Sequence, residues 1–89
     1  MPTISMFYGI IVAIFYKDTG RHNMPHIHVR YQDFKASVSI EDGALLAGDF
    51  PVRQLKMVVA WVEIHKEELL ADWELAVSGE EPFRIAPLQ

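Results

Sequence analysis

An alternation of apolar and polar residues over positions 26–41 constrains the fold more than any other feature of the chain. In residues 26–31 and again in residues 34–41, every second side chain is apolar. Such alternation is typical of a strand that buries one face and leaves the other open to solvent. The two residues between the runs, Gln32 and Asp33, are enough for a two-residue hairpin loop. The sequence therefore predicts an antiparallel hairpin with one apolar and one polar face.

The short loop also fixes which side chains lie opposite each other in this hairpin. The apolar face then holds two facing pairs, Ile27 with Val38 and Val29 with Ala36. The polar face holds three, Arg30 with Lys35, His28 with Ser37 and His26 with Ser39. We expect the following side chains to be buried: Ile27, Val29, Phe34, Ala36, Val38 and Ile40. We expect the following to be open or to line a groove: Lys35, Ser37 and Ser39.

Strand and turn signals flank this hairpin. The apolar run 9–16 is rich in β-branched and aromatic residues, which predicts a strand buried on both faces. Asp42-Gly43 is a strong hairpin signal, and residues 44–47 are the expected returning strand. Residues 48–51 end the sheet and start a helix, with Asp49 as the expected N-cap.

Helical spacing dominates the second half of the chain. Apolar residues recur three or four positions apart within residues 55–62 and 69–77, which predicts either one long helix or two helices joined near His65. Gly79 is a natural C-terminal cap. Residues 83–85, which lie between two prolines, form either a last edge strand or a docked tail.

Together these signals predict an α+β fold, in which an antiparallel sheet of about four strands is followed by one long or two short helices packed on one face. A chain of 89 residues is too short to fill a second core, so we expect residues 1–89 to form a single domain. Trp61 and Trp73 are expected to anchor the core or an interface.

Three of the four histidines lie between positions 22 and 28, and this segment is the expected functional site. His26 and His28 point to the same face of the strand, close enough to act on one small ion or phosphate. One neutral and one protonated imidazole could serve as base and acid, with Arg30 or Lys35 holding a phosphate. The catalytic residues of this hypothesis are His26, His28, Arg30 and Lys35. They predict a metal-independent phosphodiesterase or ribonuclease.

Two other hypotheses stay open for the same histidines. His22 could add a third ligand to His26 and His28, which would create a site for a divalent metal ion. No other cofactor is expected. Alternatively, the polar face simply suits a solvated strand, and an imidazole bonds a backbone carbonyl at the strand entry.

Composition narrows the classes of partner. The chain has no cysteine, which excludes disulfides and thiolate metal sites. Its formal net charge of -4 disfavours binding of nucleic acid unless a local basic patch or a partner supplies positive charge. Neither a signal peptide nor a membrane-length apolar run is present, so we expect a cytoplasmic protein that does not enter a membrane. A hydrophobic fraction of 51% favours a homodimer or a standing partner protein, bound at the sheet edge or at the Trp73 end of the helix.

Several segments of the chain together resemble a known family. They are Met1-Pro2-Thr3-Ile4, Phe7-Tyr8-Gly9-Ile10-Ile11, Pro25-His26-Ile27-His28-Val29, Gly48 to Pro51, Trp61 and Glu68-Leu69-Leu70 to Trp73. With these segments the chain resembles domain-of-unknown-function family 4160 of bacteria over nearly its whole length. The resemblance implies a small cytosolic prokaryotic module that acts with the product of a neighbouring gene in a toxin–antitoxin-like or transcription-regulatory pair. The enzyme and metal-binding hypotheses are the alternatives.

Overall fold

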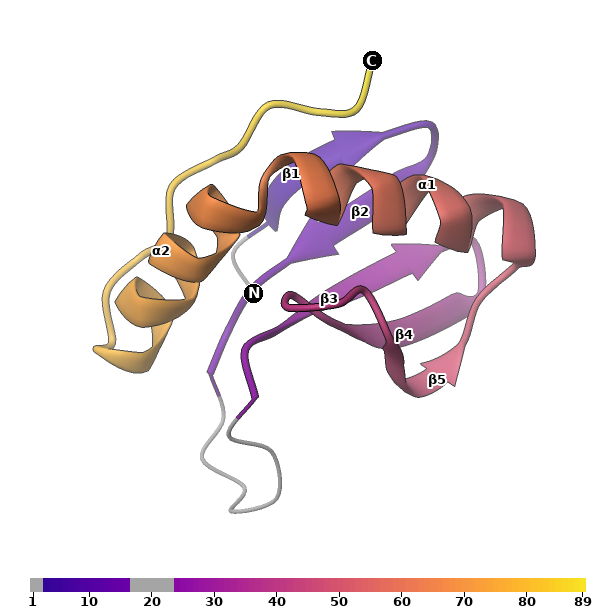
Figure 1. Ribbon diagram of the computed structural model, residues 1–89. Coiled ribbons are helices and arrows are strands. Elements are labelled where there is room, and N and C mark those ends of the chain that lie inside the picture. The colour runs from indigo at the N-terminus through magenta and orange to yellow at the C-terminus, as the bar shows by residue number, and fades with distance from the viewer. Residues whose placement is uncertain (1–2, 17–23) are drawn as a thin grey trace.

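Five antiparallel strands form a single sheet in which each strand pairs with its neighbour in sequence (Figure 1). The computed structural model describes residues 3–16 and 24–89. Its elements are β1 Thr3–Phe7, β2 Ile10–Ala13, β3 His26–Tyr31, β4 Phe34–Ser39, β5 Leu45–Asp49, α1 Val52–Ile64 and α2 Lys66–Val77. Within these described residues, neither helix is long and apolar enough to cross a membrane. The α+β class is confirmed, with five strands where about four were expected.

The additional strand arises because the N-terminal residues form a hairpin of their own. Tyr8 and Gly9 both adopt positive φ angles, 49° and 79°, and turn the chain between β1 and β2. The prediction of one strand buried on both faces over residues 9–16 is wrong. Ile11 in β2 is 38% exposed, because it points to the open face of the sheet.

The β3–β4 hairpin has the register that its alternation predicts. All of the predicted facing pairs are present, and a two-residue turn joins the strands. Gln32 adopts a positive φ of 54° in this turn. Most of the side chains predicted in the core are buried: Ile27, Val29, Ala36, Val38 and Ile40. The exception, Phe34, is half-buried and packs against the core from its edge.

Ser39 departs from the prediction for the polar face. The alternation predicts it to be open or to line a groove, but its side chain is fully buried. The turn after β4 folds back on this residue, whose N–H donates to the Ala44 carbonyl at 2.8 Å and whose carbonyl accepts from the Gly43 N–H at 2.9 Å. The prediction for Ser39 is wrong because the strand ends there and the following turn covers it. Lys35 is exposed and Ser37 is half-buried, as predicted.

The link between β5 and α1 differs from the predicted N-cap. Asp49 is the last residue of β5 and does not cap the helix. The N-cap position is Pro51, with φ -62° and ψ 142° and without a side-chain hydrogen bond. Phe50, between them, is only 6% exposed. Because Phe50 enters the core, the strand continues up to Asp49 and the helix begins later than predicted.

The two helices meet at His65, where the sequence allows a break. His65 has φ -109° and ψ 23°, yet its N–H donates to the Trp61 carbonyl at 3.0 Å and its carbonyl accepts from the Leu69 N–H at 2.9 Å. The helix axis therefore changes direction without losing these backbone bonds (Figure 1). Gly79 follows α2 with a φ of 79°, as its predicted capping role requires.

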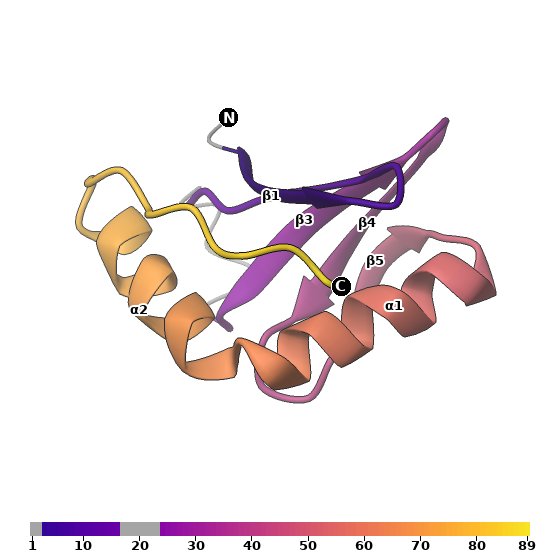
Figure 2. The same cartoon turned by 90° about the horizontal axis from the view of Figure 1, so that it is seen from above.

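The helices lie on one side of the sheet and bury an apolar core against it (Figure 2). Trp61 is fully buried, and its ring centroid lies 5.3 Å from that of Phe7. Trp73 is 4% exposed and packs edge-on against Tyr16, with centroids 5.7 Å apart. Both tryptophans are core anchors. The partner contact at the sheet edge or at the Trp73 end of the helix stays a prediction.

The residues after α2 form a docked tail rather than an edge strand. The Ile85 N–H donates to the Ile4 carbonyl at 2.8 Å, which attaches the tail to β1. The Trp61 Nε1–H donates to the Ala86 carbonyl at 2.8 Å, which attaches it to α1. The tail, yellow in Figure 2, therefore bridges the sheet and the helices.

Asp72 on α2 holds the same tail through a buried carboxyl group. It is 2% exposed, and its Oδ1 accepts a hydrogen bond from the Phe83 N–H at 2.9 Å. Burial raises the pKa of Asp72 above its ordinary value, and the nearby Glu68 carboxylate raises it further. The hydrogen bond from Phe83 lowers this pKa but does not cancel the effect of burial. The folded protein thus binds this proton more tightly than the unfolded chain does. Stability should therefore fall as the pH rises from the ordinary pKa through the raised one.

We expect Asp72→Asn to remove this part of the pH dependence, because an amide does not ionise. Thermal melts of both proteins between about pH 4 and pH 7 measure the effect. The melting temperature of the wild type should decrease relative to that of the variant as the pH rises. A difference between the two proteins that stays constant over this range would contradict the expectation.

Candidate functional site

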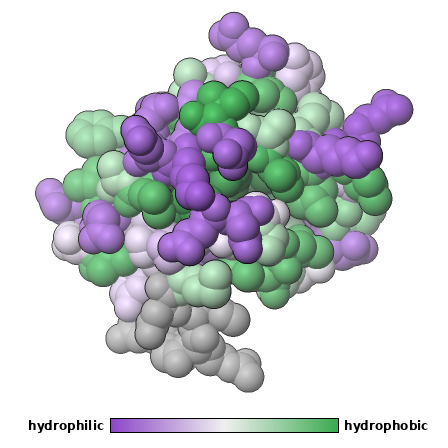
Figure 3. Space-filling model, in the orientation of Figure 1, coloured by the Kyte–Doolittle hydropathy of each residue, from purple (hydrophilic) through white to green (hydrophobic). Residues whose placement is uncertain are grey.

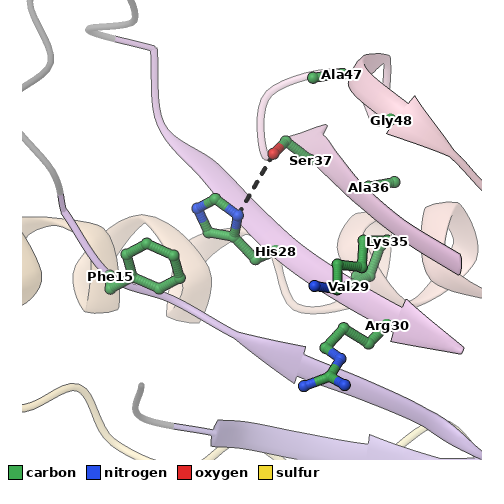
Figure 4. Close-up of a pocket in the computed structure, with 9 residues that line it drawn as sticks. All are labelled: Phe15, His28, Val29, Arg30, Lys35, Ala36, Ser37, Ala47 and Gly48. Carbon is green, nitrogen blue, oxygen red and sulfur yellow. Dashed lines mark hydrogen bonds between the residues drawn. The ribbon is translucent and has the colours of Figure 1, made fainter. Parts of the chain in front are cut away.

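The open face of the sheet carries a shallow pocket of about 330 Å³ around His28 (Figure 4). Its walls come from β3, β4, β5 and the segment that follows β2. The lining residues are Phe15, His28, Val29, Arg30, Lys35, Ala36, Ser37, Ala47 and Gly48. We call this pocket the His28 groove. It brings together three of the predicted catalytic residues: His28, Arg30 and Lys35.

His28 is held in one orientation by neighbours on both sides. Its ring stacks on Phe15, with centroids 4.0 Å apart and planes 9° from parallel. On the other side, the Ser37 hydroxyl lies 3.4 Å from Nδ1 of His28. The small side chain of Ala13 lies opposite His28 on β2, which leaves space for the Phe15 ring beside the imidazole. The imidazole therefore presents a defined face to the groove.

Two cationic side chains occupy one end of the His28 groove. Arg30 and Lys35 lie opposite each other on β3 and β4, and both are exposed. Asp49 lies opposite Lys35 on β5. Among residues 3–16 and 24–89, neither cation forms an ion pair within 4.0 Å. The two side chains therefore concentrate positive charge locally on a protein of net charge -4.

His26 lies beside His28 but does not line the groove. The ring centroids of the two histidines are 5.0 Å apart, and the His26 ring also packs against Trp73 at 4.9 Å. Nδ1 of His26 lies 2.8 Å from the Met24 carbonyl oxygen. Because a carbonyl can only accept, Nδ1 carries the proton in this bond. This contact lies at the start of β3. It matches the purely structural hypothesis for these histidines, in which an imidazole bonds a backbone carbonyl.

His22, the third ligand of the predicted metal site, lies outside the described residues. In the part of the chain that the structure describes, no three His, Asp or Glu side chains gather closely enough to hold a metal ion. The site formed by His22, His26 and His28 therefore stays a prediction, as does the expectation that no other cofactor is needed.

Phe15 and Gly48 are the groove residues that sequence reasoning missed. Two-residue spacing places Phe15 on the face of Ala13, but only the pairing of Ala13 with His28 shows that this face is also that of His28. Gly48 has a φ of 86°, and a Cβ atom there would collide with the Lys35 carbonyl oxygen. Glycine thus allows β5 to approach β4 closely beside the groove, a requirement that the sequence alone does not reveal.

These side chains are suited to an anionic ligand with flat groups. Guanidinium and ammonium groups pair with phosphate oxygens. The stacked rings of Phe15 and His28 offer a platform for a nucleobase or another planar group. The Ser37 hydroxyl adds a hydrogen-bond donor and acceptor. The groove is open along the sheet and does not enclose a ligand. An extended single strand of nucleic acid therefore fits it better than a small molecule, which usually binds in a closed pocket.

Comparison with known proteins yields one match. The family model described as Domain of unknown function (DUF4160) matches residues 9–74, which include every residue of the His28 groove. Neither the curated proteins nor the solved structures include a significant match. Because the family match covers well over half of the 89 residues, the chain belongs to the DUF4160 family.

Proposed function

We propose that this protein is a small cytosolic prokaryotic module that acts with a partner protein in a toxin–antitoxin-like or transcription-regulatory pair, and that its His28 groove binds single-stranded RNA. One observation carries the proposal: Arg30 and Lys35 line the same groove as the stacked rings of His28 and Phe15. Open sheet surfaces bind single-stranded nucleic acid with this combination: cations pair with the phosphates, and aromatic rings beside them stack on the bases.

The net charge of -4 limits the strength of this binding. Two cations can contact only a few phosphates, so binding by the isolated protein should be weak and sensitive to salt. A partner that contributes further positive charge would strengthen it. We propose that the product of a neighbouring gene is this partner.

A metal-independent phosphodiesterase or ribonuclease is the second candidate, and the 5.0 Å between the ring centroids of His26 and His28 favours it. Acid–base catalysis requires both imidazoles to reach the reacting phosphate. His26, however, packs against Trp73 and bonds the Met24 carbonyl, and it does not line the groove. We therefore propose binding ahead of catalysis. A metal-binding role depends on His22 and is a separate proposal.

Fluorescence anisotropy with a labelled single-stranded RNA of about ten nucleotides tests the proposal. We expect saturable binding by the wild type at low salt. His28→Ala should weaken binding about tenfold, because it removes half of the stacked platform, and should lower the melting temperature only slightly. Ser37→Ala is the neighbouring control, which loses one weak hydrogen bond and should weaken binding less.

The same samples distinguish the two candidates. Intact RNA after incubation, seen by gel electrophoresis, supports binding alone. Cleavage that His28→Ala abolishes would favour the ribonuclease instead. The proposal fails if the wild type does not bind the RNA, or if the loss of binding in His28→Ala merely follows a loss of folded protein.

A further inference from the structure

The outer face of α1 is an apolar surface that the rest of the described chain covers only in part: Val52 is 69% exposed, whereas Leu55 packs against the core and Val59 lies beside Gly43. It forms a shallow groove of about 570 Å³ lined by Val52, Leu55, Lys56, Val59, Ala60 and Glu63. The opposite face of α1 enters the core through Val58, Trp61 and Val62. Figure 3 looks onto the side of the molecule that carries α1 and shows hydrophobic (green) and hydrophilic (purple) residues mixed there. We call this surface the α1 groove.

The charges of the α1 groove are arranged in a self-complementary order. Lys56 and Glu63 are seven residues apart, about two helical turns or roughly 10 Å along the axis. Val59 and Ala60 lie midway between them. Reversing the helix exchanges the positions of the two charges and leaves the apolar residues in the middle. The surface therefore matches an antiparallel copy of itself.

We propose that a second copy of this chain docks in the α1 groove, with the two α1 helices antiparallel about a twofold axis between Val59 and Ala60. Lys56 of each copy then lies opposite Glu63 of the other, and Val59 and Ala60 of the two copies meet at the axis. In a parallel, in-register pair, like charges would face each other.

The size of the surface fits a weak and reversible dimer. A helix of 13 residues is about 20 Å long, and one such helix pair buries less than the roughly 1,200 Å² of a standard interface. We therefore expect dimers at high micromolar concentration. Since α1 covers the face of the sheet opposite the His28 groove, each copy keeps that groove open (Figure 2). The dimer does not depend on RNA binding.

Sedimentation equilibrium over about a hundredfold range of protein concentration tests the dimer. The wild type should show a reversible monomer–dimer equilibrium. Lys56→Glu or Glu63→Lys alone places like charges opposite each other at both ends of the interface, and each should weaken association about tenfold. The double variant K56E/E63K restores opposite charges and should return the dissociation constant to within about threefold of the wild-type value.

Glu74→Lys is the matched control for Glu63→Lys, because it makes the same charge change at an exposed residue of α2 outside the α1 groove. It should leave association unchanged, and thermal melts of every variant establish that each one folds. A wild type that is monomeric at the highest concentration would overturn the proposal. So would a dimer that both single variants leave intact, or a double variant no better than the singles.

Discussion

Trp61→Ala is expected to lower the free energy of unfolding by about 3–5 kcal/mol. The Trp61 side chain is fully buried, and its ring packs against Phe7 with centroids 5.3 Å apart. Its Nε1–H also donates to the Ala86 carbonyl, so the replacement releases one attachment of the C-terminal tail. Small domains have a total stability of only about 5–15 kcal/mol, so this loss should leave the variant marginally folded.

Urea unfolding followed by circular dichroism measures the loss. Trp61→Phe is the matched control, since it keeps an aromatic ring in the core but lacks the N–H donor. It should cost about 1–3 kcal/mol, from the lost hydrogen bond and a smaller loss of packing. If the alanine variant were no less stable than the phenylalanine variant, Trp61 would not be the anchor of this core.

Replacing Arg30 and Lys35 together by glutamate is expected to weaken RNA binding by about a hundredfold or more at low salt. The two replacements turn the cationic end of the His28 groove into an anionic one, which repels phosphates. Both side chains are exposed and lie on the polar face, so the melting temperature should change little. Anisotropy titrations at several salt concentrations should also show a flatter salt dependence for the variant.

The control for this charge reversal must change the net charge equally at another place. Arg53→Glu together with Arg84→Glu does so at exposed residues outside the His28 groove. This control should weaken binding far less than the groove variant does. Equal weakening in the two double variants would mean that overall charge, and not the groove, governs the interaction.

The register of the β3–β4 hairpin could be predicted because the apolar–polar alternation and the two-residue loop together allow few ways of pairing the two strands. A slip by one residue would have turned every apolar side chain of β3 to solvent. His28, Arg30 and Lys35 could therefore be assigned to one face from spacing alone. Ser39 could not be placed in the same way, because its burial depends on the turn that follows β4 and not on the strand.

Features that depend on packing between distant segments were not predictable from local pattern. Asp49 has the residue type of an N-cap, but burial of Phe50 keeps it in β5. The sequence allows one helix or two around His65 because no helix-breaking residue lies between positions 63 and 71, and the observed break keeps its backbone bonds on both sides. The contribution of Phe15 to the site depends on the pairing of β2 with β3, which brings the segment after β2 beside His28.

Chemical-shift mapping with isotope-labelled protein and the same RNA tests the His28 groove as the binding site most directly. We expect saturable shifts at the backbone amides of the groove residues Phe15, His28, Arg30, Lys35 and Ser37, and none at the outer face of α1. Shifts that cluster on α1 would contradict the proposed site. An absence of groove shifts at RNA concentrations that saturate the anisotropy signal would contradict it as well.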